Sequence, residues 1–129
     1  MKRVLLLSLL GALLTGCSSV EICREGGHTL VDIENTGWYL FNFIPLASGD
    51  PTQPNANTCR LFTDTVTLEN NMRLLDWAAQ QEYAGAITDV KSYLTDENVL
   101  IFLFKRHAYH TNAELLKEKP CESADMSGN

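Results

Sequence analysis

Residues 67–85 read TLENNMRLLDWAAQQEYAG, and this stretch predicts the clearest helix of the chain. Thr67 suits the N-cap, Glu69 favours the first turn, and Gly85 suits the position after the last turn. At 100° per residue, one stripe along the helix is apolar; it contains Leu68, Met72, Leu75, Ala79 and Tyr83. We therefore predict a helix over 67–84 that buries this stripe.

Extended segments flank the predicted helix on both sides. Runs of β-branched and aromatic residues cover 28–44, 59–66, 86–95 and 99–109, with turn residues at 35–37 and 96–98. Residues 45–58 are rich in Pro, Gly and small polar residues, which favours a loop. The order β-β-α-β-β predicts an α+β fold: a small antiparallel sheet of three or four strands, with the amphipathic helix packed on one face.

Two of the extended runs are apolar on both alternating faces. Trp38–Ile44 and Val99–Phe104 each place large apolar side chains at odd and even positions. One helix covers only one face of a sheet, so something else must cover the other. The 45–58 loop and the C-terminal tail are candidates. A second copy, a partner protein or a lipid surface are the others.

Composition narrows the possible functions. The chain has 129 residues, 45% of them hydrophobic and 20% charged, and a net charge of −6. These values suit one globular domain. The acidic balance argues against nucleic-acid binding and against electrostatic docking on anionic lipid headgroups, because both need a basic surface.

The N-terminal segment predicts export. Lys2 and Arg3 precede the apolar run 4–14. Eleven helical residues span only about 16 Å, too short to cross a hydrocarbon core of about 30 Å. The run is therefore expected to be the hydrophobic region of a signal peptide.

The segment ends in Leu14-Thr15-Gly16-Cys17, which resembles the lipobox of bacterial lipoproteins. The resemblance implies that diacylglycerol is attached to Cys17, that the chain is cut before Cys17, and that the new amino group is acylated, for example with palmitate. Ser18 follows the lipidated position, whereas Asp at that position retains such lipoproteins in the inner membrane. The resemblance therefore implies a cell-envelope protein of the outer membrane that faces the periplasm.

These inferences divide the chain into four parts. Residues 1–16 are a signal peptide that is removed, 17–27 are the lipidated Cys and a tether, 28–110 are the α+β domain, and 111–129 are a polar C-terminal tail with a short helical turn at 113–117. Removal of Lys2 and Arg3 leaves 8 basic and 16 acidic residues, a net charge of −8.

Cysteine and histidine are the residues most suited to chemistry. With Cys17 lipidated, Cys23, Cys59 and Cys121 remain, and the oxidising periplasm favours a disulfide. We expect a bridge that includes Cys121, because it would hold the tail, and one thiol left over. His107 and His110 would point to opposite faces of a strand. No metal site, cofactor or enzyme motif is therefore expected: Gly-x-Ser-x-Gly, His-Glu-x-x-His, Cys-x-x-Cys and phosphate-binding glycine loops do not occur.

Leu74 and Trp77 lie away from the predicted apolar stripe and are neighbours on the helix. A Trp on a polar face indicates a partner contact; alternatively, the 45–58 loop folds over it. The sequence thus predicts a non-enzymatic, lipid-anchored binding or structural module that contacts an envelope protein or itself. The alternative is a metal- or redox-responsive envelope sensor that uses the spare thiol and the histidines.

Overall fold

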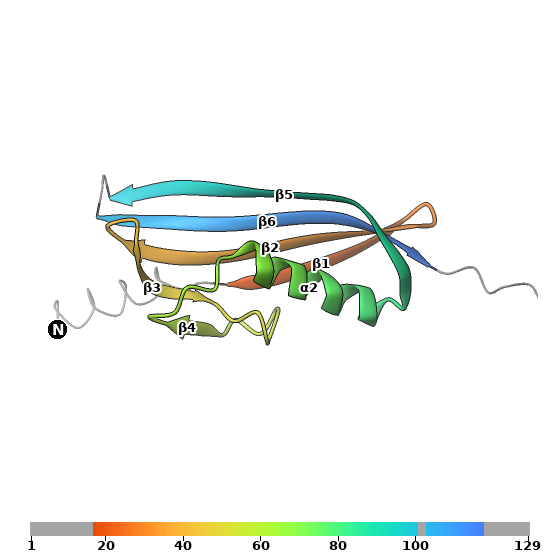
Figure 1. Ribbon diagram of the computed structural model, residues 1–129, viewed down its shortest axis with the longest axis horizontal. Helices are drawn as coiled ribbons and strands as arrows, with labels where there is room; N and C mark the ends of the chain where they lie inside the picture. Colours follow the sequence, from red (N-terminus) through yellow and green to blue (C-terminus); the bar gives the residue numbers. More distant parts are fainter. Residues whose placement is uncertain (1–16, 101–102, 118–129) are drawn as a thin grey trace, which may run out of the picture.

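The structure, a computed structural model, describes residues 17–100 and 103–117 (Figure 1). Within this part of the chain it contains six strands and one helix. These are β1 (Ser18–Glu25), β2 (His28–Leu40), β3 (Ile44–Gly49), β4 (Cys59–Leu61), α2 (Leu68–Gln81), β5 (Ala84–Leu100) and β6 (Phe104–Lys117). No helix in these residues is long and apolar enough to cross a membrane.

The strands form one antiparallel sheet in the order β4-β3-β2-β6-β5, and β1 also pairs with β2. Figure 1 shows β5, β6 and β2 running along the length of the molecule, with β3 and β4 at one end and α2 crossing beside β1. The predicted fold of three or four strands with one packed amphipathic helix is therefore wrong. Strand accounts for 61% of the structure, because several segments that we expected to be irregular join the sheet.

The expected tether at 18–27 is instead β1 and a tight turn. β1 pairs with β2 from Ser18↔Asn35 to Glu25↔His28, and Gly26 and Gly27 connect them. Both glycines have positive φ, 57° and 88°. A two-residue hairpin needs such values at both central positions, and glycine adopts them without strain. The Gly-Gly pair therefore closes a hairpin rather than ending a tether.

The expected turn at 96–98 and part of the expected tail also lie in strands. Asp96 pairs with His107 and Glu97 with Arg106, so each acidic side chain faces an imidazole or a guanidinium across β5 and β6. These pairs keep the acidic segment extended, and the hairpin turns after Leu100. Residues 111–117 continue β6 because Thr111, Ala113 and Leu115 alternate into the core. A helical turn at 113–117 is thus also wrong.

The predicted bend at 35–37 and the start of the 45–58 loop are continuous strand. Asn35 to Gly37 remain in β2, and the irregularity falls between Trp38 and Tyr39. Gly37 serves close packing, since a Cβ there would lie 2.7 Å from the Val66 side chain. Pro45 is tolerated in β3, where it pairs with Tyr39 next to this irregularity.

The helix is confirmed, but its buried face differs from the predicted stripe. Thr67 caps α2 by accepting a hydrogen bond from the backbone N–H of Asn70. The buried residues are Asn71, Leu74, Leu75, Ala78 and Ala79. Leu68 and Tyr83, which we expected in the core, are exposed. The buried face is rotated by about 70° from the predicted stripe at 100° per residue, because Asn71 is buried and donates hydrogen bonds to Tyr109 and Thr111 of β6.

The core lies between α2 and one face of the sheet. Its buried members come from β1, β2, α2 and β6; they are Val20, Val31, Ile33, Leu74, Leu75, Ala78, Ala79, Ala113 and Leu115. β5 is the sheet's outer strand beyond β6, and its side chains from Gly85 to Val99 are exposed. The face away from α2 has no layer over it within the described residues, so we refer to it as the open face.

Candidate functional site

Cys17, the predicted lipidation residue, is held against the sheet. Its backbone N–H donates to Thr36 Oγ1 at 2.9 Å, and its carbonyl accepts from the N–H of Thr36 at 2.8 Å. On the other side lies Gly49 of β3, where a Cβ would come within 2.5 Å of the backbone of Cys17 and Ser18. The backbone of Cys17 is therefore fixed against β2 and β3, directly before β1.

β3 occupies the position along β2 that follows the start of β1. Ser18 pairs with Asn35, and Ser48 pairs with Gly37. β1 and β3 thus lie end to end against the same edge of β2. Asn55 then fixes the outer edge of β1, since its side chain bonds both the N–H and the carbonyl of Val20.

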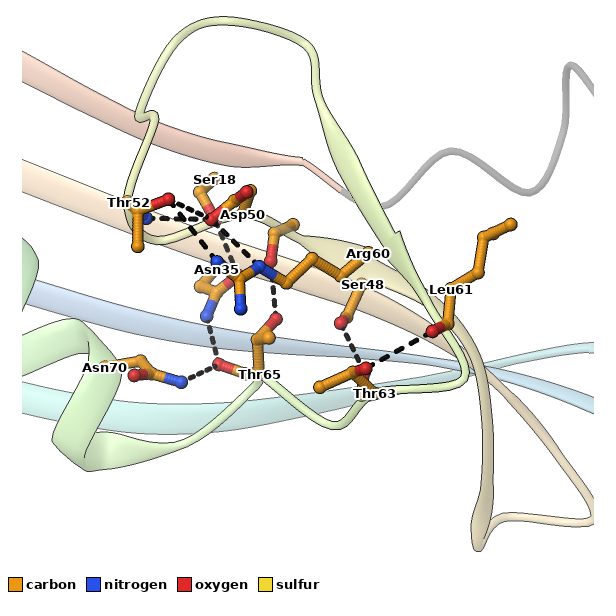
Figure 2. A network of polar contacts seen from close by, with 11 residues as sticks. Ser18, Asn35, Ser48, Asp50, Thr52, Arg60, Leu61, Thr63, Thr65 and Asn70 are labelled. Atoms are coloured by element: carbon orange, nitrogen blue, oxygen red, sulfur yellow. Dashed lines mark hydrogen bonds and ion pairs between the residues drawn. The ribbon is translucent and has the colours of Figure 1, made fainter.

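A buried polar network fixes this junction (Figure 2). Asn35 accepts from the Ser18 hydroxyl at 2.9 Å and donates to the carbonyl of Thr65 at 2.5 Å. The Thr65 hydroxyl donates to the carbonyl of Gly49, and Asn70 also donates to the Thr65 carbonyl. The network joins β1, β2, β3 and the start of α2. It therefore fixes the position of Cys17 relative to the whole domain.

The loop after β3 is closed by an ion pair. Arg60 Nε lies 3.1 Å from Asp50 Oδ1, and the Thr52 hydroxyl donates to the same oxygen at 2.6 Å. The hydrogen bond from Thr52, with support from Arg60, holds the pKa of Asp50 below its ordinary value. The carboxylate is therefore kept charged, and its role is to brace the 50–60 loop.

The open face is polar and contains a cavity. The row Glu21–Asp32–Asn112–Lys91 crosses four strands and carries two acids, an amide and an amine. A cavity of about 380 Å³ lies over this row. It is lined by Glu21, Cys23, Leu30, Val31, Asp32, Asp89, Lys91, Asn112, Ala113 and Glu114.

Farther along the open face, charged and aromatic side chains pair with one another. Arg106 lies between Glu34 and Glu97, at 3.3 and 3.6 Å. His110 stacks on Tyr93 with ring centroids 4.8 Å apart. These contacts give the open face a fixed pattern of charge, but no described group of three His, Cys, Asp or Glu side chains is placed as metal ligands.

On the opposite face of the sheet, Tyr39 and His107 form a second polar cluster. The Tyr39 hydroxyl donates to Asp64 at 2.6 Å, and burial together with this bond raises the pKa of the phenol. The His107 ring lies edge-on to Tyr39 and contacts Asp96 at 2.5 Å. The cluster ties the segment before α2 to β2 and the β5–β6 hairpin.

One end of the sheet is apolar and exposed. The β2–β3 and β5–β6 turns lie side by side there, because the N–H of Phe41 donates to the carbonyl of Leu103 at 3.0 Å. The end of β4 runs to the same place, since the N–H of Phe62 donates to the carbonyl of Leu46. We call this surface the apolar tip; it consists of Phe41, Phe43, Ile44, Leu61, Phe62 and Val99, all exposed.

The apolar tip resolves the two-sided runs noted in the sequence. Of the first run, Tyr39 is buried, while Phe41 and Phe43 lie in the turn and are exposed. The second run surrounds the β5–β6 turn, and Ile101 and Phe102 lie outside the described residues. The apolar side chains therefore gather at one end of the sheet instead of covering a second face.

The other predicted site residues are dispersed. Cys23 is exposed in the open-face cavity, and Cys59 is exposed on β4. Neither is bonded to another cysteine among the described residues. Cys121 lies outside the described residues, so the expected bridge stays a prediction. His28 contacts Glu114, far along the sheet from His107.

Of the two residues predicted to contact a partner, only one is accessible. Leu74 is 0% exposed and belongs to the core, so it is not available to a partner. Trp77 is 37% exposed and remains accessible on α2. Glu21, Asp89 and Lys91 of the cavity were not predicted from the sequence, although the alternation of charge in Asp32 and Glu34 indicated that one face of this sheet is in contact with water.

Comparisons with known proteins found no match: no family model, no curated protein and no solved structure is similar to this chain.

Proposed function

We propose that this chain is a lipid-anchored cell-envelope protein, acylated at Cys17 and held in the outer membrane with its domain in the periplasm. The observation that carries the proposal is the lipobox-like segment Leu14-Thr15-Gly16-Cys17 together with the environment of its cysteine. The backbone of Cys17 is hydrogen-bonded to Thr36, and β1 starts at Ser18.

Two features of the Cys17 environment support this assignment. Its side chain is only partly buried, whereas its backbone is fixed. An acyl chain contributes about 0.8 kcal/mol per buried CH₂, so two or three chains at one fixed residue hold a protein stably on a bilayer. The anchor therefore holds the domain directly at the membrane surface.

The role that we propose for the domain is binding or structural rather than catalytic. The open face offers a cavity of about 380 Å³ with fixed charges, and Arg106 is already neutralised by Glu34 and Glu97. Such a surface suits a polar ligand or an envelope protein. Trp77 remains a second candidate contact on the other side of the sheet.

The test is acylation and fractionation of the full chain in a Gram-negative host. Cells grown with labelled palmitate should incorporate the label into this protein, and mass spectrometry should show that the mature chain begins at a modified Cys17. The Cys17→Ala variant should lose the label and leave the envelope fraction. Cys23→Ala and Cys59→Ala are matched controls that should keep both. A Cys17→Ala variant that still pellets with the envelope after a high-salt wash would contradict the anchor.

A further inference from the structure

We infer that the apolar tip contacts the lipid bilayer beside the anchored Cys17, so that the domain is held with this end of its sheet in the membrane interface. The inference rests on the proposed lipid anchor and adds an orientation to it. Three observations carry it: the position of the tip relative to Cys17, the composition of the tip, and the residues behind it.

The tip lies close to the anchoring residue. Cys17 is hydrogen-bonded to Thr36, and Leu40 is the last residue of β2 before the tip. Four residues of strand span about 14 Å. A tilt of the sheet therefore brings Cys17 and the tip to the same interface, which is where partly inserted elements lie, about 5–10 Å into the headgroup and acyl boundary.

The tether predicted from the sequence would have allowed the domain to turn freely. Instead, β1 begins at Ser18, and Gly49 leaves no space between β3 and the backbone of Cys17. The lipid at Cys17 therefore restricts which end of the domain meets the bilayer. The apolar tip is at the end toward which β2 runs from Thr36.

The composition of the tip suits lipid. Residues 38–49 contain no Asp, Glu, Lys or Arg, although the whole chain has 26 such residues. Phe43 and Phe62 are 73% and 74% exposed, and Leu61 is 63% exposed. Exposed apolar surface of this kind is unfavourable in water. Its transfer to an acyl environment lowers the free energy by about 25 cal/mol per Å².

The residues behind the tip suit the headgroup region. Trp38, two residues before Leu40 in β2, pairs with Arg106, and Tyr39 pairs with Lys105. Trp and basic residues are enriched where a membrane protein crosses the interface. The order from the tip inwards is therefore Phe, then Trp38 beside Lys105 and Arg106, as the polarity of a bilayer surface requires.

The test is tryptophan quenching in the lipidated full chain, reconstituted into vesicles of phosphatidylethanolamine and phosphatidylglycerol. In a Trp38→Phe, Trp77→Phe background, Phe43→Trp and Phe62→Trp are two independent reporters at exposed aromatic positions. Tyr83→Trp is the control, because Tyr83 is 90% exposed and lies by the opposite end of the sheet, next to Ala84, which pairs with Lys117. Lipids brominated near the headgroup end of the acyl chain should quench the emission at positions 43 and 62 strongly and that at position 83 little, because only the tip lies at that depth.

Each other outcome overturns the inference in a distinguishable way. Vesicles that carry the protein but leave positions 43 and 62 unquenched would contradict lipid contact while the anchor stands, and would make the tip a surface for a protein. Equal quenching at all three positions would contradict the end-on orientation. Protein that does not float with the vesicles would contradict the anchor itself, and the tip proposal with it.

Discussion

Leu74 was predicted to contact a partner, but the structure places it in the core. It is fully buried among Val31, Ile33 and Leu115, whereas Leu68 on the same helix is 46% exposed. Leu74→Ala should therefore lower the free energy of unfolding by about 2–5 kcal/mol, the usual cost of emptying a core leucine site. Leu68→Ala removes the same atoms from a half-exposed position and should cost less than half as much. Urea unfolding of both variants measures the difference, and a larger loss for Leu68→Ala would restore the stripe read from the sequence.

The Arg24–Glu82 pair makes stability depend on pH. Arg24 donates two hydrogen bonds to the Glu82 carboxylate, at 2.6 and 3.1 Å, and joins β1 to the end of α2. These bonds, with help from Lys117, lower the pKa of Glu82 below its ordinary value of 4.5. A carboxyl whose folded-state pKa is depressed stabilises the fold above its unfolded pKa, and this contribution is lost as pH falls through the folded pKa.

Glu82→Gln should therefore lower the melting temperature at pH 7 and change it little at a pH below both pKa values. Melting curves of the two proteins across the acid range measure this convergence. Glu69→Gln is the control, because Glu69 forms an exposed pair with Arg73 on the solvent side of α2 and such pairs contribute little. Parallel melting-temperature profiles for wild type and Glu82→Gln would exclude the pair as a source of acid sensitivity.

At the scale of elements, local signals located the helix and one hairpin. Thr67 caps α2 as predicted, and segments 86–95 and 99–109 do pair with each other. Residues 96–98 are strand instead of the predicted turn, because Asp96 and Glu97 pair with His107 and Arg106 across the sheet. Such partners are distant in sequence, so a local preference for a turn at 96–98 could not include them. The Gly26-Gly27 pair, in contrast, is a local signal, and it favours a hairpin as well as the end of a tether.

The sheet register indicates which described cysteine can reach Cys121 to form the predicted disulfide. Cys121 follows Lys117, the last described residue of β6, by four residues, which reach about 14 Å. Cys23 pairs with Leu30, which pairs with Glu114, so it lies two strands across and three residues back, about 14 Å from Lys117. Cys59 pairs with Gly49 near the row of His107, about 30 Å back along β6.

We therefore predict a Cys23–Cys121 bridge in the exported protein. Its formation transfers two electrons and two protons from the thiols to an oxidising disulfide of the envelope, which becomes a dithiol. Peptide mapping without reduction should recover the Cys23–Cys121 peptide. Cys23→Ser should free the thiol of Cys121, and Cys59→Ser should leave the bridge intact. A Cys59–Cys121 peptide would show that the ends of the sheet are arranged differently.

For the whole molecule, the sequence indicated the anchor and the apolar runs but not their relation. The resemblance of four consecutive residues to a lipobox predicts Cys17 as the anchoring residue, and the apolar runs are visible in the composition. Their proximity depends on the contact between Phe41 and Leu103 and on the β1–β3 junction at Cys17. Both arise from pairing between strands separated along the chain, so they appear only when the sheet is assembled.

The net charge of the chain predicts whether salt should strengthen or weaken the contact between the apolar tip and the bilayer. Without residues 1–16, whose removal we propose, the chain carries 16 acidic and 8 basic residues, so an anionic bilayer should repel it even while the proposed acyl chains and the apolar tip attract it. Salt screens this repulsion, since the Debye length falls from about 14 Å at about 0.05 M to about 4 Å at about 0.5 M. Raising salt over this range should therefore increase the quenching of Phe43→Trp on vesicles rich in phosphatidylglycerol. On neutral phosphatidylcholine vesicles the quenching should not change. A protein that binds lipid through basic patches responds in the opposite direction, so a loss of quenching with salt would assign the contact to Lys105 and Arg106 rather than to the phenylalanines.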